Sequence, residues 1–247
     1  MGSIGSNLQE VKRRIAAACA AAGRDANIRT SSTADAVTPG AAPGVLLLAV
    51  SKTFDEAAVR QAHAAGQRAF GENYVQEALT KIAALADLRP AIEWHLIGPL
   101  QSNKTRVVAE AFDWVHSIDR LKTAQRLAEQ RPAWLAPLNL CLQVNVSGEA
   151  SKSGVAPADL PALARAVGAL PGDRVRLRGL MSIPEPAGDE AARRRPHSLL
   201  RELMAALVAD TGLPLDTLSM GMSNDLEAAV LEGATVVRVG TAIFGAR

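Results

Sequence analysis

Residues 45–52 have the sequence Val-Leu-Leu-Leu-Ala-Val-Ser-Lys, an apolar β-type run that ends in two polar residues. Continuous runs of branched aliphatic residues are typical of strands buried on both faces, as in parallel sheets. The same unit recurs along the rest of the chain: a short strand-like run, a polar or glycine-containing junction, and a helix-length amphipathic stretch. This pattern predicts parallel strands joined by helices.

Eight segments share the strand pattern: Val45–Lys52, Arg68–Glu72, Glu93–Gly98, Trp114–Asp119, Leu138–Ser147, Val175–Pro184, Thr217–Ser223 and Thr235–Thr241. Seven helical segments lie between them: Phe54–Ala65, Tyr74–Ala86, Ser102–Ala111, Arg120–Gln130, Pro157–Ala169, Gly188–Ala209 and Asn224–Glu232. Eight such units can close into a barrel. We therefore predict one α/β domain over residues 1–247, a (β/α)8 TIM-type barrel. An open doubly wound sheet is the main alternative, but it normally has fewer strands and a glycine-rich turn after the first one.

An additional helix is expected before the first strand. From Asn7 to Ala22 apolar residues recur at helical spacing, with Ser6 or Asn7 as the cap and Gly23 at the end. No helix is expected after the last strand, so this opening helix can take the vacant place in the outer ring. Residues 26–44 are rich in Ser, Thr, Ala, Pro and Gly without any period, which predicts a flexible surface loop.

Composition excludes several functional classes. The chain of 247 residues has a net charge of +2 and 3% aromatic residues, so a basic face with stacking aromatics is not expected. The run Arg193-Arg194-Arg195 is interpreted as a solvated helix face, and no nucleic-acid partner is predicted. Cys19 and Cys141 stand far apart in apolar surroundings, which predicts buried thiols without a disulfide. The absence of a signal sequence and of an apolar stretch of membrane length predicts a cytoplasmic protein without a membrane partner.

Lys52 is the first candidate functional residue. Active sites of α/β barrels lie at the carboxyl ends of the strands, where this lysine ends an otherwise apolar run. An amine in an apolar pocket loses its proton more readily and can attack an aldehyde. A lysine at a strand end can equally well point into water, so its meaning depends on the other strand ends.

The last two strands end in sequences suited to phosphate. Barrels often bind phosphate in the loops after strands seven and eight. Here the seventh strand leads into Ser223 and a helix start, and the eighth ends in Gly240 and Thr241, which offer close backbone approach and a hydroxyl. Alone, Ser223 is also a good helix cap and Gly240 an ordinary turn glycine.

Arg238 lies between Val237 and Val239, two residues before Gly240. Strand alternation places its side chain on the opposite face from both valines. A buried arginine needs a partner, which we expect to be either a carboxylate or an acceptor on a ligand.

Other strand ends add polar groups that could reach the same mouth, among them Asn73 and Ser182. His95 and His116 lie within apolar strands and are interpreted as core residues rather than catalysts. No metal site is predicted, because no histidine and cysteine cluster has ligand spacing.

Six stretches, in this order, resemble one known family: Ala49–Lys52, Phe70–Glu77, Trp94–Lys104, Ser151–Gly154, Gly179–Pro184 and Leu218–Gly245. They are similar to the pyridoxal 5'-phosphate (PLP) homeostasis proteins, whose fold is like the N-terminal barrel domain of alanine racemase. The resemblance covers nearly the whole chain from Leu8, although residues 26–44 are longer than the family pattern leads us to expect.

The resemblance implies a type III PLP fold, barrel domain only, with PLP as cofactor. It implies that Lys52 holds PLP as a Schiff base, that Ser223, Gly240 and Thr241 hold the phosphate, and that Arg238 lies near the pyridine nitrogen. A permanent cation there keeps the nitrogen unprotonated and weakens the ring as an electron sink.

The implied role is PLP and amino-acid homeostasis without established catalysis, with apo forms of PLP enzymes as acceptors and a monomer or weak dimer as the working state. The alternative is a PLP-dependent racemase or related enzyme. Racemases of this fold carry a β-domain and a second acid/base residue, whereas the one tyrosine here, Tyr74, falls in a helix after the second strand.

Overall fold

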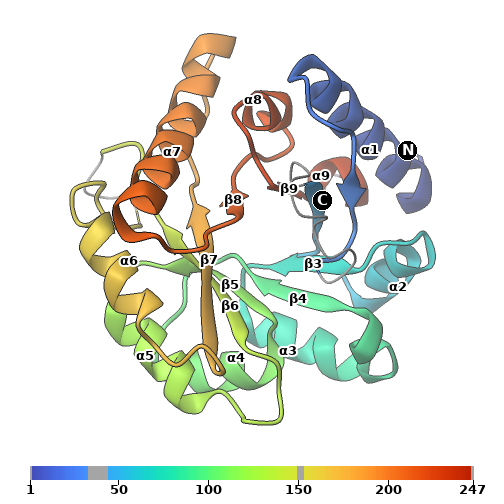
Figure 1. The fold of residues 1–247 in the computed structure, drawn as a ribbon. Coiled ribbons are helices and arrows are strands. Elements are labelled where there is room, and N and C mark those ends of the chain that lie inside the picture. The colour runs from blue at the N-terminus through green and yellow to red at the C-terminus, as the bar shows by residue number, and fades with distance from the viewer. Residues whose placement is uncertain (1, 33–43, 149–152, 246–247) are drawn as a thin grey trace.

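The barrel closes through its first and last long strands. The computed structural model of the chain describes residues 2–32, 44–148 and 153–245 (Figure 1). Parallel strands β2 to β9 pair in chain order, and β9 pairs back onto β2 through contacts such as Leu48 with Arg238. The described helices lie around the outside of this closed sheet (Figure 1). The predicted (β/α)8 TIM-type barrel is confirmed.

The barrel strands are short and almost entirely buried. They are β2 (Val45–Val50), β3 (Ala69–Glu72), β4 (Glu93–Leu96), β5 (Trp114–Ile118), β6 (Leu138–Gln143), β7 (Val175–Met181), β8 (Thr217–Ser219) and β9 (Val236–Val239). Several end earlier than their sequence pattern predicted, β6 by four residues and β8 by four. The residues beyond these ends are irregular because they turn away from the sheet to form the mouth of the barrel.

The main helices follow the predicted segments with small shifts. They are α2 (Glu56–Ala64), α3 (Val75–Ala84), α4 (Thr105–Ala111), α5 (Leu121–Gln130), α6 (Leu160–Gly168), α7 (Glu190–Thr211) and α8 (Leu226–Leu231). Two 3-10 turns, η1 (Ala86–Ala91) and η2 (Ser102–Lys104), flank α3 and α4. Pro90 lies within η1 and limits regular helix there.

The opening helix α1 (Ile4–Ala21) occupies the place in the outer ring that the sequence left vacant. It packs between α8 and α2 (Figure 1), and its buried face includes Leu8, Val11 and Ile15. The predicted cap was wrong: Ser3, not Ser6 or Asn7, accepts the hydrogen bond from the Ser6 amide at 3.2 Å.

A helix also follows the last strand, which the sequence analysis did not predict. The single turn α9 (Thr241–Phe244) forms because the Gly240 carbonyl accepts hydrogen bonds from the amides of Ile243 and Phe244. The Phe244 ring stacks on Phe54 with centroids 5.1 Å apart. This ring contact holds α9 at the barrel mouth.

Part of the predicted loop 26–44 is a strand. β1 (Ile28–Arg29) pairs in parallel with the start of β2, and the Thr30 carbonyl accepts a hydrogen bond from the Ala69 amide. β3 pairs with β2 only near the carboxyl end of β2. The backbone groups in the first part of β2 are therefore available to pair with β1. Residues 33–43, which make up most of the predicted loop, lie outside the described residues.

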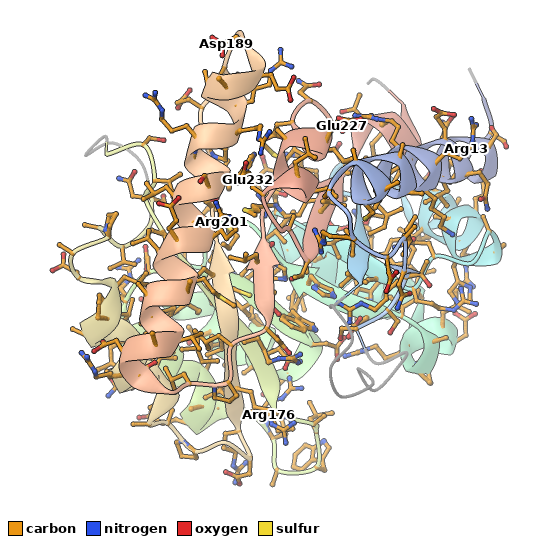
Figure 2. All side chains as sticks on the ribbon, turned by 45° about the horizontal axis from the view of Figure 1, so that its top comes forward. Arg13, Arg176, Asp189, Arg201, Glu227 and Glu232 are labelled. Carbon is orange, nitrogen blue, oxygen red and sulfur yellow. The ribbon has the colours of Figure 1, made fainter. Side chains whose placement is uncertain are left out.

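Helices α7 and α8 are joined by an ion-pair cluster. The Glu232 carboxylate, 7% exposed as a residue, accepts from Arg194 at 2.7 Å and from Arg201 at 3.2 Å. Figure 2 shows Arg201 and Glu232 facing each other between the two helices. Arg194 is therefore a structural ion-pair partner rather than a residue of a wholly solvated face.

Candidate functional site

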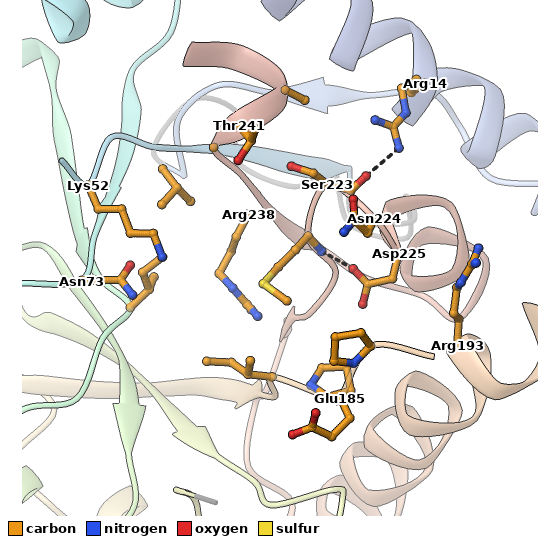
Figure 3. A pocket seen from close by; sticks show the side chains of 18 of the residues that line it. Arg14, Lys52, Asn73, Glu185, Arg193, Ser223, Asn224, Asp225, Arg238 and Thr241 are labelled. Carbon is orange, nitrogen blue, oxygen red and sulfur yellow. Dashed lines mark hydrogen bonds between the residues drawn. The ribbon is translucent and has the colours of Figure 1, made fainter. Parts of the chain in front are cut away.

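A cavity of about 1270 Å³ opens at the carboxyl ends of the strands. Its polar lining residues are Arg14, Lys52, Asn73, Glu185, Arg193, Ser223, Asn224, Asp225, Arg238 and Thr241 (Figure 3). Its apolar lining includes Val50, Ile97, Ile183 and Met222. The cavity is thus built of a few polar side chains on an aliphatic wall, as small-molecule sites commonly are.

Lys52 enters this cavity from the turn after β2. Its side chain is half-buried, and Figure 3 shows the amine directed inward beside Asn73. Within the described part of the chain, its Nζ makes no hydrogen bond or ion pair, and it is the one lysine that lines the cavity. The amine is therefore available to a ligand.

Ser223 and Thr241 lie on the side of the cavity opposite Lys52, with Arg238 between them and the lysine (Figure 3). Ser223 follows β8 and Thr241 begins α9. Among the described residues, the amides of Ser223, Asn224 and Thr241 have no main-chain acceptor. These amides and hydroxyls form a set of donors suited to an anion.

The Met222–Asp225 turn is held in shape by Asp225. Its carboxylate accepts from the Met222 amide at 2.7 Å and lies 2.9 Å from Nε2 of the buried His197 in α7. Burial pushes the pKa of Asp225 upward, but the hydrogen bonds from His197 and Met222 outweigh this and bring it below its ordinary value. The carboxylate thus stays ionised and fixes the turn that carries Ser223.

The opening helix also supports this turn. Arg14 of α1 donates to the Ser223 carbonyl at 3.0 Å and to Glu227 at 2.7 Å. The helix that completes the outer ring therefore also holds the anion side of the cavity.

Arg238 is 3% exposed and projects from β9 into the cavity (Figure 3). Its guanidinium donates to the Ser219 carbonyl at 2.6 Å, to the Ser219 hydroxyl at 2.9 Å and to the Ser182 carbonyl at 2.7 Å. The predicted choice between a carboxylate and a ligand missed these partners, since main-chain carbonyls can hold a buried cation. Burial lowers the pKa of Arg238 to about 10, so the group remains a cation at neutral pH.

A buried chain of polar groups leads from Arg238 down the barrel interior. The Ser219 hydroxyl lies 2.8 Å from His116 Nδ1, and His116 Nε2 lies 3.0 Å from His95 Nδ1. His95 stacks on Trp114 with centroids 5.4 Å apart. Both histidines are fully buried, as their interpretation as core residues required.

His116 gives the protein a testable pH dependence. Burial, aided by the neighbouring His95 and the Arg238 cation, lowers the pKa of His116 well below its usual range. The unfolded chain takes up a proton near pH 6.5 and the folded chain does not, so His116 destabilises the fold increasingly as pH falls below 6.5. We expect a loss of about 1 kcal/mol in unfolding free energy from this group between pH 7 and pH 5.5.

Denaturant unfolding of the wild type and of His116→Asn at both pH values measures this loss. The variant should show the smaller fall, because its amide does not titrate. An identical fall in both proteins would contradict the assignment.

Asn73 and Ser182 differ in their relation to the cavity. Asn73 lines it, and its buried Oδ1 has no hydrogen-bond partner among the described residues. The backbones of Asn73 and Gly98 lie close together, because a Cβ on Gly98 would lie 2.1 Å from the Asn73 carbonyl oxygen. Ser182 is fully buried behind the cavity lining, where its carbonyl holds Arg238, and its own Oγ has no partner in the part of the chain that the structure describes.

Several lining residues escaped the sequence analysis. Arg14 and Phe54 belong to helices or turns with no motif, and Arg193 was interpreted as part of a solvated face. Ile183 and Met222, 47% and 36% exposed, place apolar surface at the mouth. A sequence signal existed for two of them, since Met222 lies in the same turn as Ser223 and Ile183 lies near the end of the predicted sixth strand.

The described residues hold no group of three or more His, Cys, Asp or Glu residues that could bind a metal ion. None of their helices is long and apolar enough to cross a membrane.

The barrel and its mouth define the class of the protein. Residues 34–247 match the family model "Alanine racemase, N-terminal domain". PipY of Synechococcus elongatus, in its structure with PLP bound, superimposes with a TM-score of 0.75 at 46% identity, covering 81% of this chain and 92% of that chain.

Curated relatives narrow the class. The pyridoxal phosphate homeostasis protein of Pseudomonas aeruginosa is 62% identical over 247 residues, which is all of this chain and 97% of the relative. The Escherichia coli K12 protein of the same name is 49% identical over 250 residues, which is all of this chain and 98% of that relative. The chain belongs to the pyridoxal phosphate homeostasis protein family, and the predicted resemblance is confirmed.

Proposed function

We propose that this protein binds PLP as a Schiff base on Lys52 and serves PLP and amino-acid homeostasis as a carrier rather than as an enzyme. The observation that carries this proposal is the free Lys52 amine, which faces a set of anion donors across one cavity (Figure 3). When bound, PLP supplies an aldehyde carbon for the lysine and a pyridine ring that can act as an electron sink.

The residues present fit this group. Asn73 Oδ1 has no hydrogen-bond partner within the described ranges, which leaves an acceptor for a polar ligand. Gly240 lets the start of α9 lie close to β2, because a Cβ there would lie 3.1 Å from the Val50 carbonyl oxygen. In the proposal Ser223, Gly240 and Thr241 hold the phosphate and Asn73 lies beside the ring, while Ser182, behind the lining, acts through its carbonyl contact with Arg238.

Arg238 favours binding over carbanion chemistry. Its guanidinium remains charged in the cavity and is held by Ser182 and Ser219. In the proposal this cation lies near the pyridine nitrogen and disfavours a proton there, which limits the ring as an electron sink. The described lining residues also include no tyrosine, histidine or cysteine to serve as a second acid/base group. Tyr74 is 57% exposed and lies outside the lining.

The alternative function, an amino-acid racemase or related PLP enzyme, would use the same barrel but needs such a second acid/base group, and the described lining contains no tyrosine, histidine or cysteine to supply it. For a carrier, the acceptors we propose are apo forms of PLP enzymes, reached by the chain as a monomer or weak dimer. The exposed Ile183 and Met222 at the mouth offer an apolar surface for such an encounter.

The test is an absorbance spectrum of the purified protein with added PLP, followed by borohydride reduction and peptide mass mapping. We expect a band near the violet edge of the visible range and a reduced adduct on Lys52. A protein that stays colourless and acquires no adduct would overturn the proposal. Lys52-dependent turnover in racemisation assays across amino acids would overturn the non-catalytic role.

A further inference from the structure

Lys81 occupies an unusual position for a lysine in the middle of a helix. It belongs to α3, yet it is only 4% exposed and points inward toward the turn after β2. Its Nζ lies 2.7 Å from Glu72 Oε1 and 2.8 Å from Glu77 Oε1. A buried ion cluster of this kind costs desolvation, so its retention calls for an explanation beyond stability.

The cluster contacts the residue before Lys52. Lys81 Nζ donates to the Ser51 carbonyl at 2.6 Å, and the Ser51 hydroxyl donates to Glu72 Oε1 at 2.6 Å. Ser51 is fully buried, and both its carbonyl and its hydroxyl contact the cluster.

The cluster also contacts the residue after Lys52. The Thr53 amide donates to Glu77 Oε1, and the Thr53 hydroxyl donates to the Lys52 carbonyl at 2.6 Å. Among the described residues Thr53 is the one non-glycine with a positive φ, at 66°. A β-branched residue adopts this conformation only at a cost, so contacts around the turn must hold it there.

We propose that Lys81 is a positioning residue: together with Glu72 and Glu77 it clamps Ser51 and Thr53, so that the Lys52 amine is held facing the cavity. The inference rests on the proposed function, since it explains how the Schiff-base lysine is aimed. Lys81 itself is not among the residues that line the cavity.

The charges of the cluster agree with this role. Burial raises the pKa of Glu72, and the Lys81 ammonium opposes that shift. Without Lys81, Glu72 would be a buried carboxyl group with Ser51 as its one partner among the described residues, and Glu77 would lose the cation that holds it under the Thr53 amide. The clamp would then loosen on both sides of Lys52.

The test separates aiming of Lys52 from general damage to the cavity. Dissociation constants are measured for PLP and for 4-deoxypyridoxine 5'-phosphate, which has the ring and phosphate but no aldehyde. In Lys81→Met we expect the preference for PLP over the analogue to fall about tenfold or more, because a misplaced amine forms the Schiff base less well. The affinity for the analogue should stay near the wild-type value.

Glu77→Ala is the second variant, because Glu77 is partly exposed and its loss leaves the Glu72–Lys81 pair in the core. It should lower the same preference to a smaller extent. Arg60→Met, which removes an exposed ion pair with Asp87, is the control and should leave the preference unchanged.

The outcomes are distinct. An unchanged preference in folded Lys81→Met, or in Glu77→Ala where Lys81→Met does not fold, overturns the clamp while the proposed function stands. Equal loss of affinity for both compounds also overturns it, because that result indicates a purely structural role. A wild type without a borohydride-fixed adduct on Lys52 overturns the proposed function and the inference with it.

Discussion

Lys52→Ala is expected to lose the violet-edge band and the borohydride-fixed PLP adduct completely. Lys52 is the one described lysine that lines the cavity, and its Nζ has no other partner among the described residues. The anion donors and Arg238 remain in the variant, so PLP should still bind without a covalent bond. We expect the affinity for PLP to fall about a hundredfold, because the bond to a pre-positioned amine is lost. Affinity for 4-deoxypyridoxine 5'-phosphate should change little.

The control is Lys122→Ala, which removes an exposed lysine on α5 away from the cavity. Free PLP also reacts with surface amines, so this variant measures the background of adduct formation. Its band and affinity should match those of the wild type. If Lys52→Ala kept the same adduct as Lys122→Ala, another amine would be the attachment point.

The sequence was sufficient to predict the barrel because each element and its neighbour in the fold are also neighbours along the chain. Each strand and helix has its own hydrophobic period, and right-handed crossovers leave few ways to join eight such units. Residues such as Lys52, Ser223 and Thr241 follow from the same logic, since parallel strands all end at one face of the barrel.

The remaining site residues depend on contacts that periodicity does not encode. Arg14 reaches the mouth only because α1 packs between α8 and α2 once the barrel is closed. Lys81 looks like a polar position of an amphipathic helix, and its burial depends on the two carboxylates it meets. Arg238 is held mainly by main-chain carbonyls, and side-chain identity carries no signal for such acceptors.

The second large effect is expected at Gly179 in β7, where β8 approaches closely. Gly179 lies opposite Thr217, and a Cβ at this position would lie 1.8 Å from the Thr217 carbonyl oxygen and 2.7 Å from its carbonyl carbon. Both atoms belong to the backbone, so no side chain can rotate away. Gly179→Ala should therefore force β8 away from β7.

The consequence reaches the site, because β8 has only three residues and its end holds Arg238 together with the end of β7. We expect Gly179→Ala to lose about 3 kcal/mol or more of unfolding free energy, measured as a lower denaturant midpoint without PLP. Any folded fraction should bind PLP more weakly, since the Ser219 and Ser182 carbonyls that hold Arg238 move apart.

Gly172→Ala is the matched control, because a Cβ there meets no heavy atom within 4 Å. Its unfolding free energy should stay within about 0.5 kcal/mol of the wild-type value. Equal midpoints for the two variants would show that β7 and β8 can separate without cost, and Arg238 would then need another anchor.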